Sequence, residues 1–240
     1  MSGADTTCAY CREVLTGNVL QDAWGTRVHS HHHIPMCYSC GKWIIGDVFS
    51  TEDGRMICKD CLSSIVMKSS QKKWVDTRVR NVLILHGINN LPLKIQVQIV
   101  PSQIIKRKNP LKESSTAIQL GLTCCDELIL NNNRVCRHSV FMLTHQTKIQ
   151  FAGTLAHEYL HVWQNQMNIK LSQDMSEGFC NMGTFYMFQS IDNIVAKNYI
   201  QRMMSDQDPN YGIGFRKVKE IADSLHTDNL KLVMNKLLTI

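Results

Sequence analysis

The sequence predicts an α+β protein in two parts, a small N-terminal module held together by metal ions and a larger domain with a short sheet and several helices. Three observations support this prediction. Pairs of cysteine and histidine residues recur along the N-terminal part, and a His-Glu-x-x-His motif begins at His157. Beyond residue 68, strand periodicity alternates with helix periodicity. The chain has 240 residues, which is enough for both parts.

The N-terminal module contains closely spaced pairs of residues whose side chains bind zinc. The ligand pairs are Cys8 with Cys11, His29 with His32, Cys37 with Cys40, and Cys58 with Cys61. We assign one zinc ion to the first two pairs and a second zinc ion to the last two. Each ion then has only protein ligands, which is typical of a structural site. Redox-active pairs and disulfides are the alternatives.

The module is an internal repeat with a period of 29 residues. The repeat matches ligands and glycines alike: Cys8 falls on Cys37, Cys11 on Cys40, Gly17 on Gly46, Gly25 on Gly54, His29 on Cys58 and His32 on Cys61. Each repeated glycine marks a turn that the module needs. His31 and His33 fall outside the repeat, so we expect them to be solvated, although either can replace His29 or His32 as a ligand. A module this small should depend on its metal ions for folding.

The His157-Glu158-x-x-His161 motif predicts a hydrolytic metal centre. Residues four apart lie on the same face of an α-helix, so His157 and His161 can bind one ion. Glu158 can then act as general base on a water bound to that ion. The alternative is an ordinary amphipathic helix with two exposed histidines.

Glu177 is the predicted third ligand of this ion. Two histidines and one carboxylate form a common catalytic zinc site that leaves one position open for water. The alternative is a capping box in which Asp174 is the N-cap and Glu177 reaches back to it. Asn181 lies one turn beyond Glu177 and is a candidate to hold one of the ligands in place.

The boundary between the parts is predicted near residues 68–73, where Lys-Ser-Ser-Gln-Lys-Lys interrupts the apolar pattern. Beyond it, the pattern predicts a helix over 74–85 and strands over 95–100 and 139–143. Helices over 151–167, 175–190, 215–225 and 228–238 follow. A small sheet leading into helices that hold the metal is the zincin arrangement.

Composition excludes several other classes. The net charge of +6 is modest, and the Lys106-Arg107-Lys108 cluster has no aromatic residues beside it, so we predict no nucleic-acid partner. No apolar run reaches membrane-spanning length and no signal-peptide core follows Met1, so we predict a cytoplasmic protein without membrane contact. Four further cysteines are expected to be small buried residues in a reducing compartment: Cys124, Cys125, Cys136 and Cys180.

Three C-terminal strings resemble a known family. They are Leu-Ala-His-Glu-Tyr-Leu-His-Val-Trp at 155–163, Leu-Ser-Gln-Asp-Met-Ser-Glu-Gly-Phe-Cys at 171–180, and Tyr-Gly-Ile-Gly-Phe-Arg at 211–216. They are similar to the peptidase of the plant organ-size-control LIM peptidases and their compact bacterial relatives, which place a LIM zinc module before the peptidase. The resemblance implies that His157, His161 and Glu177 bind zinc and that Glu158 is the base. It also makes Tyr211 a candidate oxyanion donor, with a turn residue packed on Phe215 as the alternative.

The sequence departs from that family in three ways. His32 stands where the plant modules have a cysteine, and four residues separate the two zinc sites, as in a tandem zinc ribbon. The acidic ubiquitin-interacting helices of the plant proteins are missing from this sequence, which weakens the case for activation by ubiquitin. Ser176 replaces a second glutamate, which leaves Glu177 as the carboxylate available there.

The sequence therefore predicts a LIM-like tandem zinc-ribbon module over 1–68 and a zincin-type (gluzincin) metallopeptidase domain over 69–240. The predicted function is a zinc-dependent endopeptidase with one catalytic and two structural zinc ions. Its predicted partners are protein substrates and, by the resemblance, ubiquitin or ubiquitinated proteins. The alternative is a LIM-type interaction or adaptor protein whose peptidase domain is inactive or autoinhibited. A nucleic-acid-binding zinc ribbon is a third interpretation, which the small charge disfavours.

Overall fold

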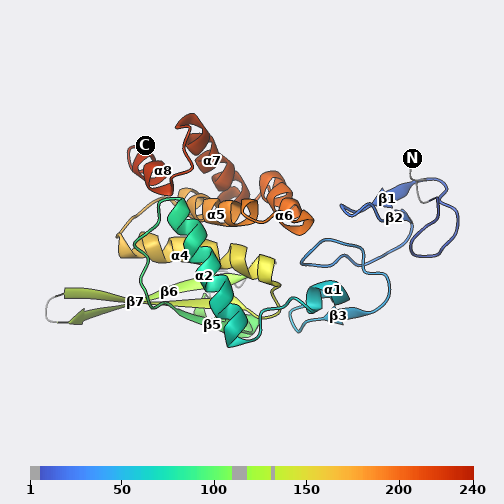
Figure 1. Ribbon diagram of the computed structural model, residues 1–240, viewed down its shortest axis with the longest axis horizontal. Helices are drawn as coiled ribbons and strands as arrows, with labels where there is room; N and C mark the ends of the chain where they lie inside the picture. The colour runs from blue at the N-terminus through green and yellow to red at the C-terminus, as the bar shows by residue number, and fades with distance from the viewer. Residues whose placement is uncertain (1–5, 110–117, 131–132) are drawn as a thin grey trace. The chain divides into compact units, whose positions relative to one another are not determined.

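The computed structural model describes residues 6–109, 118–130 and 133–240, and it omits the side chains of 127–130 and 133–135 (Figure 1). The chain divides into two compact units, Met1–Ile65 and Val66–Ile240. The division lies three residues before the predicted boundary because Val66 belongs to the second unit: its side chain is buried in that core and its amide donates to the Gln146 carbonyl. Among the helices described, none is long and apolar enough for a membrane crossing.

Over residues 6–65, the first unit has two small hairpins and one short helix. Strands β1 (Val19–Gln21) and β2 (Arg27–His29) form the first hairpin, β3 (Val48–Ser50) and β4 (Met56–Cys58) form the second, and α1 (Lys59–Leu62) follows. The first hairpin pairs Val19 with His29 and the second pairs Val48 with Cys58. Since both partners shift by the same 29 residues, the backbone confirms the repeat found in the sequence.

The repeated glycines occupy turns that other residues rarely tolerate. Gly17 and Gly46 have φ values of 68° and 103°, and Gly25 and Gly54 have φ values of 81° and 85°. These values lie in the left-handed region, where a Cβ atom is strained. The matching glycines therefore have the conformational role that the sequence repeat indicated.

The second unit combines a three-stranded sheet with a helical layer. Its elements are α2 (Ser69–Leu85), β5 (Gln96–Val100), α3 (Ser102–Lys108), β6 (Gly121–Leu130), β7 (Asn133–Leu143), α4 (Lys148–Gln166), α5 (Gln173–Gln189), α6 (Ile194–Ser205), the π-helix η2 (Pro209–Ile213), α7 (Gly214–Ser224) and α8 (Leu230–Leu237). The strand order is β5-β7-β6, with β5 parallel and β6 antiparallel to β7. The predicted α+β class is confirmed, and β6 forms one edge of the described sheet.

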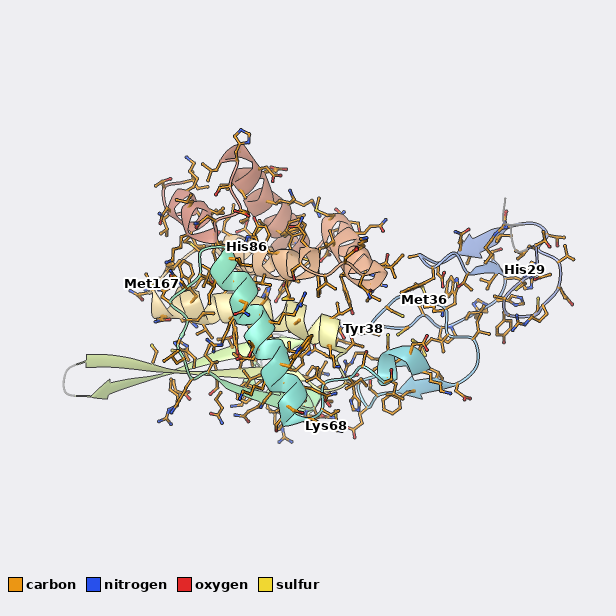
Figure 2. All side chains as sticks on the ribbon, viewed as in Figure 1. His29, Met36, Tyr38, Lys68, His86 and Met167 are labelled. Atoms are coloured by element: carbon orange, nitrogen blue, oxygen red, sulfur yellow. The ribbon has the colours of Figure 1, made fainter. Side chains whose placement is uncertain are left out.

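Helix α2 begins earlier than predicted. The segment expected to be a linker forms its first turn, because the Gln71 side chain accepts hydrogen bonds from the amides of Met67 and Lys68. Lys68 and His86 mark the two ends of α2, and Met167 marks the end of α4 (Figure 2). Strand β7 begins six residues before the predicted strand because it pairs along its length with β6.

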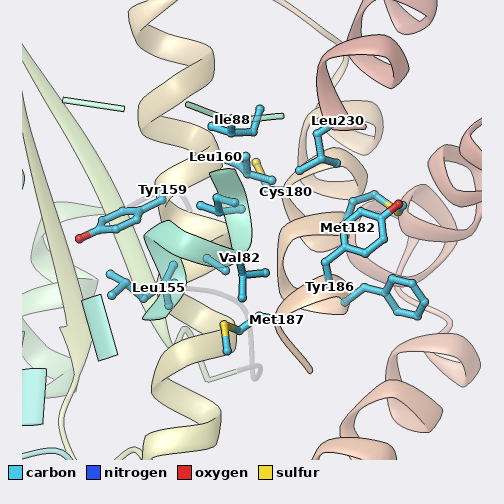
Figure 3. Close-up of a cluster of buried hydrophobic side chains, with 14 of the residues drawn as sticks. Val82, Ile88, Leu155, Tyr159, Leu160, Cys180, Met182, Tyr186, Met187 and Leu230 are labelled. Carbon is cyan, nitrogen blue, oxygen red and sulfur yellow. The ribbon is translucent and has the colours of Figure 1, made fainter. Parts of the chain in front are cut away.

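The main core lies between α2, α4 and α5. Figure 3 shows that side chains from these helices meet in one cluster, which includes Val82, Leu155, Tyr159, Leu160, Cys180, Met182 and Met187. Tyr159 is fully buried and donates a hydrogen bond to Asp76 on α2. Helices α4 and α5 approach closely at Gly183, where a Cβ atom would lie 2.7 Å from Leu160 Cδ1. This close packing sets the distance between the faces that carry the predicted ligands.

Candidate functional site

Helix α4 carries the His-Glu-x-x-His motif in a buried setting. Its first turn is capped by Thr147, whose hydroxyl accepts from the Gln150 amide. His157 is 9% exposed and Glu158 is 5% exposed. An amphipathic surface helix would expose such polar residues, so the alternative of two solvated histidines is wrong for His157.

Two histidine nitrogens and one carboxylate oxygen converge between α4 and α5. His157 Nε2 lies 3.0 Å from Glu177 Oε2, His161 Nε2 lies 3.3 Å from the same oxygen, and the two nitrogens are 3.1 Å apart. Ligand atoms about 2.0–2.2 Å from a tetrahedral zinc ion lie about 3.3–3.6 Å from one another. The three atoms therefore have nearly the spacing of three corners of a zinc site.

Glu177 is ionised and turned toward the histidines. Burial acts to raise the pKa of this carboxyl, but the imidazoles of His157 and His161 beside it outweigh burial and hold the pKa well below its usual range. The capping-box alternative is wrong, because the N-cap of α5 is Ser172. Asp174 instead pairs with Lys217 and accepts a hydrogen bond from the Ser172 hydroxyl.

Asn181 orients His157. Its Oδ1 lies 2.9 Å from His157 Nδ1, and its amide nitrogen donates to the Tyr211 carbonyl at 2.9 Å. An amide oxygen only accepts, so we assign the imidazole proton to Nδ1, which leaves the lone pair of Nε2 facing the site. The sequence singled out Asn181 for this supporting role, and the contact is present.

Gln164 supports His161, and sequence reasoning missed it. Its Oε1 lies 3.3 Å from His161 Nδ1 and accepts a hydrogen bond from Ser176 at 3.0 Å. Gln164 stands three residues after His161, so the two side chains are neighbours on one helix face. This spacing identifies Gln164 as a partner of His161 once His161 is taken as a metal ligand. Ser176, which departs from the family pattern, thus contributes a hydroxyl to this arrangement.

Cys180 also lies near the histidines, and together with His157 and His161 it forms a group that can hold a metal ion. Its sulfur is 3.3 Å from His161 Nδ1, however, whereas Nε2 is the atom that faces Glu177. Burial raises the pKa of the Cys180 thiol to about 11, so this thiol must lose a proton to bind an ion, whereas the Glu177 carboxyl is already ionised. We therefore assign the third ligand position to Glu177.

Cys180 is buried as expected, but Cys124, Cys125 and Cys136 are only partly buried, which corrects the sequence prediction.

Glu158 points toward the sheet edge rather than into the ligand cluster. Its Oε2 accepts a hydrogen bond of 2.7 Å from Thr123 on β6. The sequence predicted neither this strand nor this contact, because no motif joins residues that lie 35 positions apart.

Tyr211 reaches the site from the π-helix η2. Its hydroxyl donates to Glu177 Oε1 at 3.3 Å. Burial, together with the nearby carboxylates of Glu177 and Glu158, raises the pKa of this phenol, so it stays a donor. Phe215 packs on Phe185 with ring centroids 5.5 Å apart. The sequence left two roles open for Tyr211, a residue of the site or a turn residue packed on Phe215. The Tyr211 hydroxyl lies at the site, and π-helical turns are frequent at functional sites.

Glycines bring the segments 171–180 and 211–216, which carry the last two sequence strings, into close contact. A Cβ atom on Gly178 would lie 2.3 Å from the Gly214 carbonyl oxygen, and one on Gly214 would lie 2.2 Å from the Asp174 carbonyl oxygen. The backbones of α5 and α7 therefore touch in a way that only glycine permits. This contact holds the segment with Glu177 against the segment with Tyr211.

The first unit brings together both predicted sets of structural ligands. The ligand atoms of each set lie within 4.8 Å of one another, in the groups Cys8, Cys11, His29, His32 and Cys37, Cys40, Cys58, Cys61. His31 and His33, which are exposed, belong to neither group. All of the cysteines described are free thiols, so the disulfide alternative has no support in the structure.

The donor atoms in the first unit suit zinc. The His32 Nε2 atom is buried and has no hydrogen-bond partner in the part of the chain described, as expected for a nitrogen that binds an ion. His29 Nδ1 lies 3.5 Å from Cys11 Sγ, while its Nε2 lies 3.1 Å from the Val14 carbonyl. Hydrogen bonds from Cys40 and Cys61 lower the pKa of Cys37, which favours the thiolate form that metals bind.

Comparison with known proteins gives a distant relative. The chain is 26% identical over 188 residues to Protein DA1 from Arabidopsis thaliana. The match covers 64% of this chain and 34% of that protein, so the chain spans about a third of the length of this curated relative. No family model matches, and no solved structure matches. The similarity supports a distant relationship to a DA1-like family.

Proposed function

We propose that the chain is a zinc-dependent endopeptidase with a LIM-like zinc module before a zincin-type domain. The observation that carries this proposal is the convergence of His157 Nε2, His161 Nε2 and Glu177 Oε2 within 3.3 Å. A site with three protein ligands leaves a position for water, whereas the two sets in the first unit have four ligands each. The proposed complement is one catalytic zinc ion and two structural ones.

The residues around this site have distinct roles in the proposed reaction. Zinc, when bound, acts as a Lewis acid that polarises a carbonyl and lowers the pKa of a coordinated water toward about 7. Glu158 accepts the proton of the attacking water and returns it to the leaving amine. Tyr211, whose phenol stays protonated, turns its hydroxyl from Glu177 Oε1 to the developing oxyanion and donates a hydrogen bond to it.

The proposed setting is the cytoplasm, with protein substrates as the primary partners. The free thiols support a reducing compartment. The LIM-like module serves partner binding or regulation, and ubiquitin or ubiquitinated proteins are candidate partners because of the distant similarity to Protein DA1.

Cleavage by wild type and Glu158→Gln tests this function. We expect wild type to cleave itself or a proteome-derived library and the variant to lose at least about 100-fold in rate, since general base catalysis contributes about 10²–10⁴. The library is digested with and without ubiquitin, and zinc is counted in parallel. We expect equal zinc content in both proteins.

Glu220→Gln is the matched control, because it removes an exposed carboxylate on α7. Equal cleavage by Glu158→Gln and wild type would show that Glu158 is not the base. A wild-type protein without cleavage activity that still binds partners through its first unit would favour the adaptor alternative.

A further inference from the structure

The carboxylate of Glu158 is held from strand β6. The Thr123 hydroxyl lies 2.7 Å from Glu158 Oε2 and 3.1 Å from the backbone carbonyl oxygen of the same residue. A hydroxyl has one hydrogen to donate, and the closer acceptor is also the charged one, so Thr123 donates to Oε2. Glu158 is 5% exposed, so little water competes for this oxygen.

The other carboxylate oxygen faces a glycine. A Cβ atom on Gly121 would lie 2.6 Å from Glu158 Oε1 and 2.8 Å from Thr154 Cγ2, which is closer than such atoms approach. Gly121 and Thr123 are two residues apart, so both face α4 from the same side of β6. The two oxygens of Glu158 therefore have different surroundings, one hydrogen-bonded and the other beside the position where β6 has no side chain.

We propose that Thr123 is a positioning residue for Glu158 and that Gly121 leaves room for the carboxylate in this orientation, with Oε1 as the oxygen that accepts the proton. The inference rests on the proposed peptidase function. Oε1 takes the proton as one O–H bond of the attacking water breaks, and the new O–H bond breaks in turn when the proton passes to the leaving amine nitrogen. Oε2 remains hydrogen-bonded to Thr123 throughout, which keeps the carboxylate in one orientation.

Steady-state kinetics of Thr123→Val and Thr123→Ser tests the proposal. The substrate is a quenched fluorescent peptide copied from a site that wild type cleaves in the library. We expect Thr123→Val to lose about 10- to 100-fold in kcat with little change in KM, because a misplaced group near the reacting atoms costs up to about 10²-fold. Thr123→Ser keeps the hydroxyl and should restore most of kcat. Gly121→Ala should lower kcat without removing a hydrogen bond.

Thr184→Val is the control, because it removes the hydroxyl of another partly buried threonine, which donates to the Gly153 carbonyl.

A second readout does not depend on activity. Urea unfolding of the zinc-loaded full chain, followed by helical circular dichroism, compares Thr123→Val, Glu158→Ala and the double variant. We expect non-additive effects on stability, because the two side chains contact each other.

The outcomes separate this inference from the proposed function. An active wild type with an unchanged kcat in Thr123→Val, or additive effects on stability, would overturn the positioning role alone. A zinc-loaded wild type that cleaves nothing would overturn the peptidase function and this inference with it.

Discussion

Replacement of Glu177 by alanine is expected to remove the catalytic zinc ion and all cleavage activity, while both zinc ions of the first unit remain. Glu177 Oε2 is the atom that faces both imidazole nitrogens, and two histidines alone do not make a catalytic zinc site. We expect the loss of zinc affinity to exceed the 10- to 100-fold that follows when a supporting residue is removed. Metal counting by mass spectrometry and zinc titration measure the effect.

Two variants on the same helix serve as controls for Glu177→Ala. Asp174→Ala removes a neighbouring carboxylate that pairs with Lys217, and it should leave the zinc content unchanged. Cys180→Ala removes the sulfur that contacts His161 Nδ1, and it should also retain the third ion. If Glu177→Ala keeps this ion and Cys180→Ala loses it, the thiolate and not the carboxylate is the third ligand.

Chelation of zinc is expected to unfold the first unit and to leave the core of the second unit folded. Apart from its cysteines, the apolar core around Cys8 has Val28 and Ile34 as its buried residues in the described part of the first unit. Structural zinc contributes about 10–16 kcal/mol, which matches or exceeds the entire stability of a typical domain, about 5–15 kcal/mol. The second unit has an extended core between its helices, so we expect it to fold without metal.

Hydrogen exchange of the full chain measures this effect. We expect residues 6–65 to lose protection in the presence of a strong chelator and to regain it when zinc is restored. Cys58→Ala should lower protection in the second hairpin even with zinc present, whereas Cys136→Ala should not, because Cys136 belongs to neither group of ligands. Unchanged protection of the first unit after complete zinc removal would contradict the structural role of these ions.

The parts of the site that could be predicted from the sequence are those that follow from local periodicity. The helical spacing of His157 and His161 and the repeat that aligns Cys8 with Cys37 both depend on regular backbone geometry, so a single sequence reveals them. The position of Glu177 beside the two histidines could be predicted because a catalytic zinc site needs a third ligand, and the next helix must pack on the first.

The parts that could not be predicted depend on tertiary contacts. Strand β6 reads Gly-Leu-Thr-Cys-Cys-Asp-Glu-Leu-Ile-Leu, without clear alternation, and its position follows from pairing with β7. The hydrogen bond from Thr123 to Glu158 therefore had no signal in the sequence. The π-helix that places Tyr211 was equally hidden, because the close packing of Gly178 on Gly214 depends on how two helices meet.

The central claim is that His157, His161 and Glu177 bind one zinc ion, and anomalous diffraction at the zinc edge tests it most directly. Crystals of the zinc-loaded wild-type chain should give a peak about 2.0–2.2 Å from both Nε2 atoms and from a Glu177 oxygen. Two further peaks should lie among the ligands of the first unit. A crystal structure with zinc in the first unit and no peak between α4 and α5, or with that ion bound by Cys180 in place of Glu177, would contradict the account.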